Sequence, residues 1–233
     1  MHIVNIPQWA VERVIDRCGS AHPYADLDPV RTALIVVDMQ NGFMVEGVAH
    51  ALCRAAVDIV PNINRLAAAV RRTGGKVAWI KTTYDPSWVG MHAKMRPEKV
   101  AKRIESLSKG STGHQLHPTL DVAPGDLTVE KTRYSAFLPD SSNLAGQLRA
   151  IGCDTVLIAG TVTNVCCESS ARDAMMMNFH TVMVSDANAA ASDAEHNATL
   201  VNFYVMFGDV MDTSYLIERL EAGAGAALRT AAE

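Results

Sequence analysis

The chain has 233 residues, which is enough for one large domain that buries its own core without disulfides or a structural metal. Its net charge is −4 and no segment is dominated by Lys or Arg, so nucleic acid is not an expected partner. The longest apolar runs end well short of the ~20 residues that cross a bilayer, and no secretory signal is expected.

Five cysteines occur without a disulfide or zinc pattern. Cys18, Cys53 and Cys153 stand alone, Cys166 and Cys167 are adjacent, and there is no C-x-x-C pair. Unpaired thiols in odd number are typical of a reducing compartment. We therefore expect a cytoplasmic protein with no metal and no cofactor.

The first predicted elements lead from an N-terminal arm into a buried strand. Residues 1–30 contain three prolines and one helix over residues 9–17. We expect this arm to dock either on its own domain or on a neighbouring subunit. Residues 32–39 form a continuous apolar run rich in β-branched side chains, which indicates a strand buried on both faces.

Strands and helices alternate along the rest of the chain, over a single domain of residues 31–222. Residues 84–125 interrupt the alternation with four prolines and one short helix near residues 98–107, and connections this long tend to be functional. The Ala/Gly-rich segment 223–233 is expected to be a flexible tail. The other predicted elements are helices over 55–73, 143–151, 164–178, 193–207 and 213–222, and strands over 76–83, 127–130, 155–159, 180–185 and 209–211.

This alternation predicts an α/β fold with a parallel sheet and helices on both of its faces. In such sheets, ligands bind outside the carboxyl ends of the strands. Polar residues that follow the strands are therefore expected to converge. The candidates are Asp38, the segment 83–85, Lys131 and the turn Gly160–Cys166.

Cys166 is the strongest candidate nucleophile, because it follows a buried strand at the start of a predicted helix. The free N–H groups and dipole of a helix N-terminus stabilise a thiolate, and a neighbouring cation would lower the pKa of the thiol further. The alternative is that Cys166, like Cys53 and Cys153, is a small buried hydrophobe. Cys167 points about 100° away around the helix and is expected to pack in the core.

Asp38 and Lys131 are weak candidates alone and stronger as a pair. Asp38 ends an apolar strand, where it either takes part in chemistry or caps a turn, and Lys131 ends the third strand, where a lysine is often solvated. Beside a thiol, a carboxylate and an ammonium supply a general base and a charge partner. The turn Gly160–Cys166 adds backbone N–H groups that could face a developing oxyanion.

Three sequence blocks resemble the signatures of the isochorismatase-like cysteine hydrolases. They are Val-Val-Asp-Met-Gln-Asn-Gly-Phe around Asp38, Val-Glu-Lys-Thr-Arg-Tyr-Ser-Ala-Phe around Lys131, and Ala-Gly-Thr-Val-Thr-Asn-Val-Cys-Cys around Cys166. The resemblance implies one three-layer domain with a six-stranded parallel sheet of order 3-2-1-4-5-6 and an Asp38–Lys131–Cys166 triad. It also implies a cis peptide bond between Thr161 and Val162, and an oxyanion hole made by the N–H groups of Val162 and Cys166. Family members are commonly dimers or tetramers, so a homo-oligomer is expected, in which a neighbour's loop could complete the pocket.

Within this family, the motifs favour hydrolysis of a small ureido or N-carbamoyl acid. The Asp-x-His-x-x-x-His metal block of the members that hydrolyse nicotinamide is absent, since Asp85 and His92 lack ligand spacing. True isochorismatases lack the nucleophilic cysteine, whereas this chain has Cys166. The block Lys-x-Arg-Tyr-Ser-x-Phe and the segment Tyr-Asp-Pro-Ser-Trp look most like the ureidoacrylate hydrolases, which implies cleavage of a C–N bond through a thioester. The open alternatives are an amidase for another small carboxamide or lactam, and a non-catalytic relative that binds a ligand or forms an oligomeric scaffold.

Candidate substrate-binding residues lie near the triad blocks and in the long connection. Arg133 could pair with a substrate carboxylate or form a salt bridge at the sheet edge, and His196 is expected to pack. Tyr134 and Phe137 could line the pocket or pack. The full set is Gln40, Phe43, Tyr84, Trp88, Arg133, Tyr134 and Phe137. The histidines of the long connection, expected to be solvated, are His92, His114 and His117.

Overall fold

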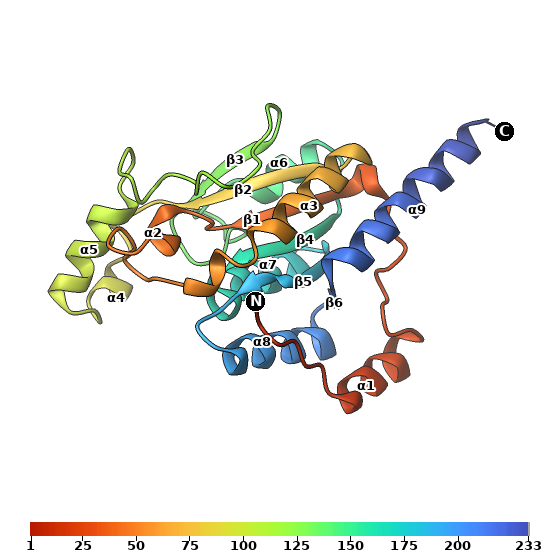
Figure 1. Ribbon diagram of the computed structural model, residues 1–233, viewed down its shortest axis with the longest axis horizontal. Helices are drawn as coiled ribbons and strands as arrows, with labels where there is room; N and C mark the ends of the chain where they lie inside the picture. Colours follow the sequence, from red (N-terminus) through yellow and green to blue (C-terminus); the bar gives the residue numbers. More distant parts are fainter. Residues whose placement is uncertain (233) are drawn as a thin grey trace.

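Six parallel strands form the central sheet of the protein (Figure 1). The structure is a computed structural model that describes residues 1–232, with side chains described as far as Ala226. The strand order is β3-β2-β1-β4-β5-β6, which confirms the predicted α/β fold and its 3-2-1-4-5-6 sheet. The strands are β1 Thr32–Val37, β2 Lys76–Thr82, β3 Leu127–Lys131, β4 Thr155–Thr161, β5 His180–Ala189 and β6 Asp209–Met211.

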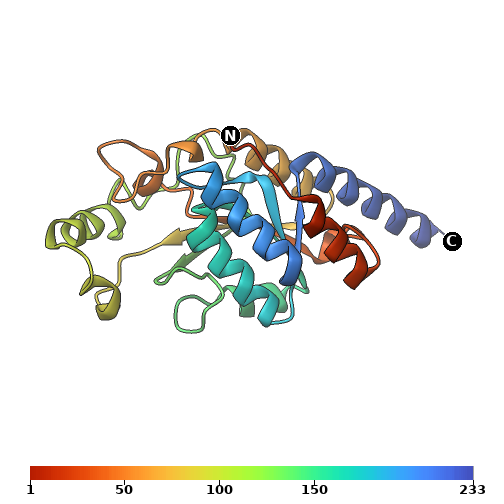
Figure 2. The ribbon, with the colours of Figure 1, turned by 90° about the horizontal axis from the view of Figure 1, so that it is seen from below.

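Helices cover both faces of the sheet and complete the predicted three layers (Figure 2). One face packs against α3 Val60–Arg72 and α9 Thr213–Ala232. The other face packs against α1 Gln8–Cys18, α6 Leu144–Ala150, α7 Glu168–Met176 and α8 Asp193–Met206. Further helices are α2 Asn41–Met44, α4 Val89–His92 and α5 Pro97–Leu107. Across residues 1–232, no helix is both long and apolar enough to cross a membrane.

The burial of β1 explains why the sheet needs two helical layers. Every residue of β1 is buried. Ala33, Ile35 and Val37 belong to the core on the α7 and α8 side, while Leu34 and Val36 belong to the core on the α3 side. Because successive side chains of a strand point to opposite faces, an unbroken apolar run requires cover on both.

The fifth strand is longer than predicted, since β5 continues to Ala189. Its extension pairs with β4 beyond a bulge, where Gly160 is opposite Asn188. Gly160 has φ +119°, and a Cβ there would lie 2.1 Å from the carbonyl oxygen of Val37. Glycine therefore allows β4 to pass close to β1 just before the turn that carries Cys166.

The last helix is also longer than predicted. α9 continues to Ala232, whereas the sequence predicts a helix over 213–222 and a flexible tail over 223–233. Alanine is the strongest helix former, which accounts for a helical backbone in this Ala-rich segment. Figure 1 shows α9 projecting from the end of the domain opposite α4 and α5. The flexibility of the segment stays a prediction, and its final residue lies outside the described part of the chain.

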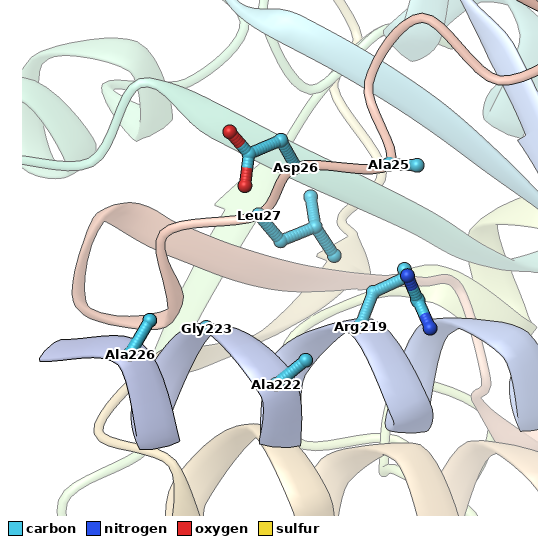
Figure 3. Close-up of a pocket in the computed structure, with 7 residues that line it drawn as sticks. All are labelled: Ala25, Asp26, Leu27, Arg219, Ala222, Gly223 and Ala226. Atoms are coloured by element: carbon cyan, nitrogen blue, oxygen red, sulfur yellow. The ribbon is translucent and has the colours of Figure 1, made fainter. Parts of the chain in front are cut away.

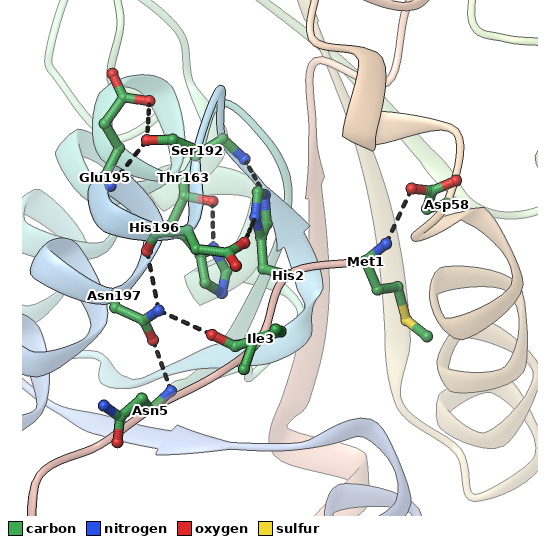
Figure 4. Close-up of polar contacts among 12 residues, drawn as sticks. Met1, His2, Ile3, Asn5, Asp58, Thr163, Ser192, Glu195, His196 and Asn197 are labelled. Atoms are coloured by element: carbon green, nitrogen blue, oxygen red, sulfur yellow. Dashed lines mark hydrogen bonds and ion pairs between the residues drawn. The ribbon is translucent and has the colours of Figure 1, made fainter.

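The N-terminal arm docks on its own domain (Figure 4). The ring of His2 stacks on the ring of His196 with 4.5 Å between centroids, and His2 Nε2 accepts a hydrogen bond from the N–H of Ala190 at 2.9 Å. The N–H of Asn5 donates to the side chain of Asn197 at 2.7 Å. These contacts hold the first residues of the arm against α8.

A small cavity lies between the end of the arm and α9 (Figure 3). It measures about 330 Å³ and is lined by Ala25, Asp26, Leu27, Arg219, Ala222, Gly223 and Ala226. The arm residues in this lining lead directly into the beginning of β1. The cavity therefore lies at the amino end of the strand, away from the strand ends where the site is predicted.

Candidate active site

Asp38 and Lys131 form a buried ion pair at the carboxyl ends of β1 and β3. Lys131 Nζ lies 2.8 Å from Asp38 Oδ2, and both side chains are fully buried. Thr82 ends β2, the strand between them, and its hydroxyl donates to Asp38 Oδ1 at 2.9 Å. Lys131 Nζ also donates to Thr82 Oγ1 at 2.5 Å and to the carbonyl oxygen of Arg133 at 3.1 Å. All three ammonium hydrogens thus have acceptors.

Backbone geometry directs both side chains to the same point. Lys131 is opposite Thr82 in the register of β2 and β3, so its side chain reaches across the end of β2. Asp38 has φ 53°, a left-handed conformation that Asp adopts more readily than most residues. Its N–H still donates to the carbonyl oxygen of Ile80 at 3.0 Å. The turn therefore begins at Asp38 without loss of the sheet hydrogen bond.

The charge of Lys131 is fixed by its surroundings. Burial alone lowers the pKa of Lys131, but the charge of Asp38, together with contact with Cys166, outweighs burial and raises it. The ammonium is therefore protonated at neutral pH. A buried ammonium with an anionic partner and satisfied hydrogen bonds is a stable arrangement only while both partners are present.

Cys166 lies in a π-helical turn, Thr163–Cys167, that precedes α7. Only 4% of Cys166 is exposed, and its thiol interacts with the side chains of Asp38 and Lys131. Burial raises the pKa of the Cys166 thiol to about 12, with Lys131 lowering it and Asp38 raising it. The prediction of a lowered pKa is wrong, because desolvation of the buried sulfur is the larger effect. Cys167 is fully buried in the core, as predicted.

The turn between β4 and the π-helical turn has a cis peptide bond between Thr161 and Val162, as the sequence blocks imply. The carbonyl oxygen of Val162 accepts hydrogen bonds from the N–H groups of Val165 and Cys167 at 3.0 and 3.3 Å. Neither bond uses the N–H of Cys166. That N–H, together with the N–H of Val162, is the predicted oxyanion site.

His196 anchors the same turn from α8. Its Nε2 lies 3.0 Å from the carbonyl oxygen of Ser185, and its Nδ1 lies 2.9 Å from Thr163 Oγ1. Because a carbonyl only accepts, Nε2 carries the proton and Nδ1 accepts from the Thr163 hydroxyl. Burial, followed by the charge of His2, lowers the pKa of His196 to about 4. The ring is therefore neutral at pH 7, and the prediction that His196 packs in the interior is confirmed.

Gln40 was predicted to bind substrate, but its side-chain amide is hydrogen-bonded within the protein. Its amide donates to the carbonyl oxygens of Thr82 and His114 at 3.2 and 3.0 Å and accepts from the N–H of Thr82 at 2.7 Å. His114 is 4% exposed, and its Nε2 lies 2.8 Å from Thr83 Oγ1. The prediction that His114 is solvated is wrong, because the long connection folds back onto the end of β2.

Two of the predicted pocket aromatics are buried. Phe137 packs edge-on against Phe179 with 5.4 Å between centroids, so the packing alternative is the one observed. Phe43 packs edge-on against the ring of His50 with 4.8 Å between centroids, in the core on the α3 side of the sheet. Phe43 and His50 lie where α2 and the chain after it meet α5, since His50 also contacts Arg103.

The other two histidines of the long connection are half-buried rather than fully solvated. The ring of His92 stacks on Tyr84 with 5.2 Å between centroids. His117 Nδ1 lies 2.7 Å from Thr119 Oγ1. Over the part of the chain that the structure describes, no group of three or more His, Cys, Asp or Glu side chains is placed to hold a metal ion.

Trp88, Arg133 and Tyr134 meet at a cavity of about 540 Å³ beside α7. The rings of Trp88 and Tyr134 pack edge-on at 4.8 Å, and the Arg133 guanidinium lies 5.3 Å from the centroid of Trp88. Arg133 Nη1 is also 2.7 Å from Asp85 Oδ2, so the salt-bridge alternative for Arg133 is observed. The other lining residues are Ser135, Leu138, Ser169, Arg172, Asp173 and Met176.

Two residues that border the site were not anticipated from the sequence. Thr82 could have been found, because it ends a strand that lies between those of Asp38 and Lys131. Arg103 on α5 is only 5% exposed, with its guanidinium 5.6 Å from the centroid of Trp88. The signal for Arg103 is its spacing, four residues before the buried Leu107, which puts a charged residue on the apolar stripe of a helix.

An all-parallel sheet of this strand order, with a carboxylate, an ammonium and a cysteine meeting at its carboxyl edge, defines a class of α/β proteins. This chain belongs to the isochorismatase family, because the family description Isochorismatase domain matches residues 32–214.

Individual relatives agree with this membership. Ureidoacrylate amidohydrolase RutB of Methylobacterium radiotolerans is 34% identical over 207 residues, covering 81% of this chain and 79% of that protein. The protein of the same name from Pantoea ananatis is 32% identical and covers 94% of this chain and 95% of its own. A cysteine hydrolase structure from Pseudomonas syringae pv. phaseolicola 1448A has a TM-score of 0.75 and 29% identity, covering 85% of this chain and 96% of that one. The structure of N-carbamoylsarcosine amidase from Thermoplasma acidophilum has a TM-score of 0.65 and 27% identity, covering 78% of this chain and 96% of that one.

Proposed function

We propose that this protein is a cysteine amidohydrolase that cleaves a C–N bond of a small ureido, or N-carbamoyl, acid through a thioester intermediate. The observation that carries the proposal is the buried Asp38–Lys131 pair beside the thiol of Cys166. The names of the relatives, ureidoacrylate amidohydrolase and N-carbamoylsarcosine amidase, support a ureido or carbamoyl group as the part of the substrate that is attacked.

The first step is attack by Cys166 with transfer of its proton to Asp38. With a pKa of about 12, on the order of one thiol in 10⁵ is ionised at pH 7. A preformed thiolate is therefore too rare to carry the reaction, and Asp38 accepts the proton as the sulfur attacks the carbonyl carbon. Lys131 keeps Asp38 ionised before the transfer and stays charged throughout.

The developing oxyanion is stabilised by the backbone N–H groups of Val162 and Cys166. Donors of this kind act in a water-excluded site, where they need no reorganisation as charge develops. The C–N bond then breaks, and protonated Asp38 gives its proton to the departing amine. The carbonyl carbon remains bound to the sulfur of Cys166 as a thioester.

Hydrolysis of the thioester returns the site to its starting state. Asp38, again a carboxylate, takes a proton from a water molecule that attacks the carbonyl carbon. The carbon–sulfur bond breaks and Cys166 recovers its proton from Asp38. Such a cycle requires no metal or organic cofactor.

The compartment and assembly state are also part of the proposal. Cys166 has to be reduced to act, and all five cysteines are free thiols, which supports a cytoplasmic location. We expect a homo-oligomer that takes a small-molecule substrate and no nucleic acid. Light scattering coupled to size-exclusion chromatography measures the oligomeric state, and a monomer at all concentrations would contradict that part of the proposal.

Ammonia release from a panel of N-carbamoyl acids, small carboxamides and lactams tests the function. We expect turnover of N-carbamoyl acids, and a loss on the order of 10³ or more in kcat for Cys166→Ala. Cys167→Ala is the matched control, because it removes the adjacent buried thiol and leaves the proposed nucleophile in place. A Cys166→Ala variant that keeps a tenth of the activity would overturn the nucleophile assignment. Turnover of lactams or carboxamides alone would replace the proposed substrate class.

A further inference from the structure

One buried cation beside the site has no acidic partner. Arg103 is 5% exposed, and within the described residues no carboxylate lies at ion-pair distance from its guanidinium. Its Nε is buried without any hydrogen-bond partner in that part of the chain. A buried charge without compensation is costly, so such a residue is expected where a ligand supplies the missing partner.

The guanidinium of Arg103, on α5, is near enough to the reaction centre to interact electrostatically with Cys166 and Asp38. It lies 5.6 Å from the centroid of Trp88, which lines the cavity beside α7. Burial lowers the pKa of Arg103, while its interactions with Tyr134, Cys166, Asp38 and Tyr84 favour its charge. Asp38 is not available as a partner, because Lys131 already lies 2.8 Å from its carboxylate.

His50 orients the guanidinium without neutralising it. His50 Nδ1 lies 3.0 Å from the carbonyl oxygen of Gly42, so Nδ1 carries the proton. His50 Nε2 therefore accepts from Arg103 Nη1, at 3.2 Å. Burial, followed by the charge of Arg103, lowers the pKa of His50 to about 4, so the ring stays neutral at pH 7. Phe43 packs edge-on against the same ring and holds it in place.

The charges around the site leave one positive charge unbalanced. Asp38 and Lys131 cancel, the thiol of Cys166 is neutral, and Arg103 remains. Arg133, the arginine that the sequence suggests for this role, is already paired with Asp85 at 2.7 Å. An anionic substrate would complete the balance at Arg103.

We infer that Arg103, held by His50, binds the carboxylate of the substrate and selects ureido acids over neutral ureas of the same shape. The inference rests on the proposed function and adds the residue that sets its specificity. A planar guanidinium with free donors suits a carboxylate, which can accept two parallel hydrogen bonds.

The test compares ureidoacrylate with its methyl ester, which has the same ureido group and no negative charge. The measurement is kcat/KM for ammonia release by the wild type, Arg103→Met, Arg103→Lys and Arg133→Met. Arg103→Met should lower kcat/KM for the acid on the order of 100-fold, mainly through KM, and change that for the ester less than threefold. Arg103→Lys should fall in between, since it keeps the charge and loses the fork of donors. Arg133→Met is the matched control and should leave the acid-to-ester ratio unchanged.

Three outcomes would overturn the inference. The first is an equal loss of kcat/KM for acid and ester in Arg103→Met. The second is an acid-to-ester ratio that changes more in Arg133→Met than in Arg103→Met. The third is a wild type that does not prefer the acid. If Arg103→Met does not fold, as judged by circular dichroism, an unchanged ratio in Arg103→Lys overturns it as well. Failure of the proposed function gives a different result, because the wild type would then release ammonia from neither compound.

Discussion

Iodoacetamide should modify the exposed Cys18 long before it modifies Cys166. With a pKa of about 12, the thiolate fraction of Cys166 at pH 7 is on the order of 10⁻⁵. An unperturbed thiol with a pKa of about 8.5 is about 3% ionised at the same pH. Since only the thiolate is alkylated, Cys166 should react on the order of 10³ times more slowly than an ordinary thiol. Its rate should rise about tenfold per pH unit across the neutral and mildly alkaline range.

Two substitutions should move this reactivity in opposite directions. Asp38 raises the pKa of Cys166 and Lys131 lowers it. Asp38→Asn should therefore speed alkylation of Cys166 at least tenfold, the equivalent of one pKa unit, while lowering turnover by 10²–10⁴ as the general base is lost, both order-of-magnitude estimates. Lys131→Met should slow alkylation and turnover together. Faster alkylation together with lost turnover is the result expected if the Asp38 carboxylate both raises the pKa of the thiol through its charge and accepts the proton during catalysis.

Timed quenching followed by peptide mass spectrometry measures the modification of each cysteine separately. A Cys18→Ser variant checks that modification at the surface does not alter the result. Cys166 alkylated faster than Cys18 at pH 7 would refute the reasoning, because the reaction would then begin from a thiolate. So would an Asp38→Asn variant in which Cys166 becomes less reactive.

Three further predictions concern stability. Lys131→Met should lower the free energy of unfolding by about 3–5 kcal/mol, since it leaves a buried carboxylate unpaired; urea denaturation measures the loss, and a change below about 1 kcal/mol would contradict it. His50 and His196 each have a pKa lowered to about 4, so the unfolded chain binds protons that the folded chain does not. Stability present above pH 6.5 should therefore be lost as the pH falls through 4, by up to about 3 kcal/mol for each ring, and less steeply in His196→Gln. Gly160→Ala should lower the melting temperature by about 10 °C or prevent folding, whereas Gly125→Ala, also at positive φ but with open space around it, should cost less.

The convergence of Asp38 and Lys131 could be predicted because it depends on topology. Strands in a parallel sheet all end at one edge, and alternation of strands with helices is visible in the sequence. Asp38 and Cys166 each follow a strand and Lys131 ends one, so knowing the strand order is enough to bring them together. The strand order itself came from the resemblance of the three blocks, since periodicity alone does not determine which strands are neighbours.

The electrostatics of the site could not be predicted in the same way. The direction of the pKa shift of Cys166 depends on how completely the sulfur is desolvated, and a helix start in the sequence does not reveal this. His114 and Arg103 were missed for a related reason. Both lie in the long connection. The burial of His114 is decided by how the chain folds back onto β2, and Arg103 is marked only by its place on the apolar stripe of α5. Arg133 was a candidate because it lies in a signature block, and the sequence left its role open because its partner, Asp85, is distant in the sequence.

The ion pair between Asp38 and Lys131 joins residues 93 positions apart in the chain. Contacts of this separation form late when a chain folds, because the loop has to close before the pair stabilises anything. β1 pairs with β2 and β4, but Lys131 reaches Asp38 only once β3 has been added at the edge of the sheet. During refolding, helical structure should therefore return before turnover does. A partly folded chain without β3 in place would have Cys166 but no Asp38–Lys131 ion pair. Catalysis therefore becomes possible only when β3 has joined the edge of the sheet.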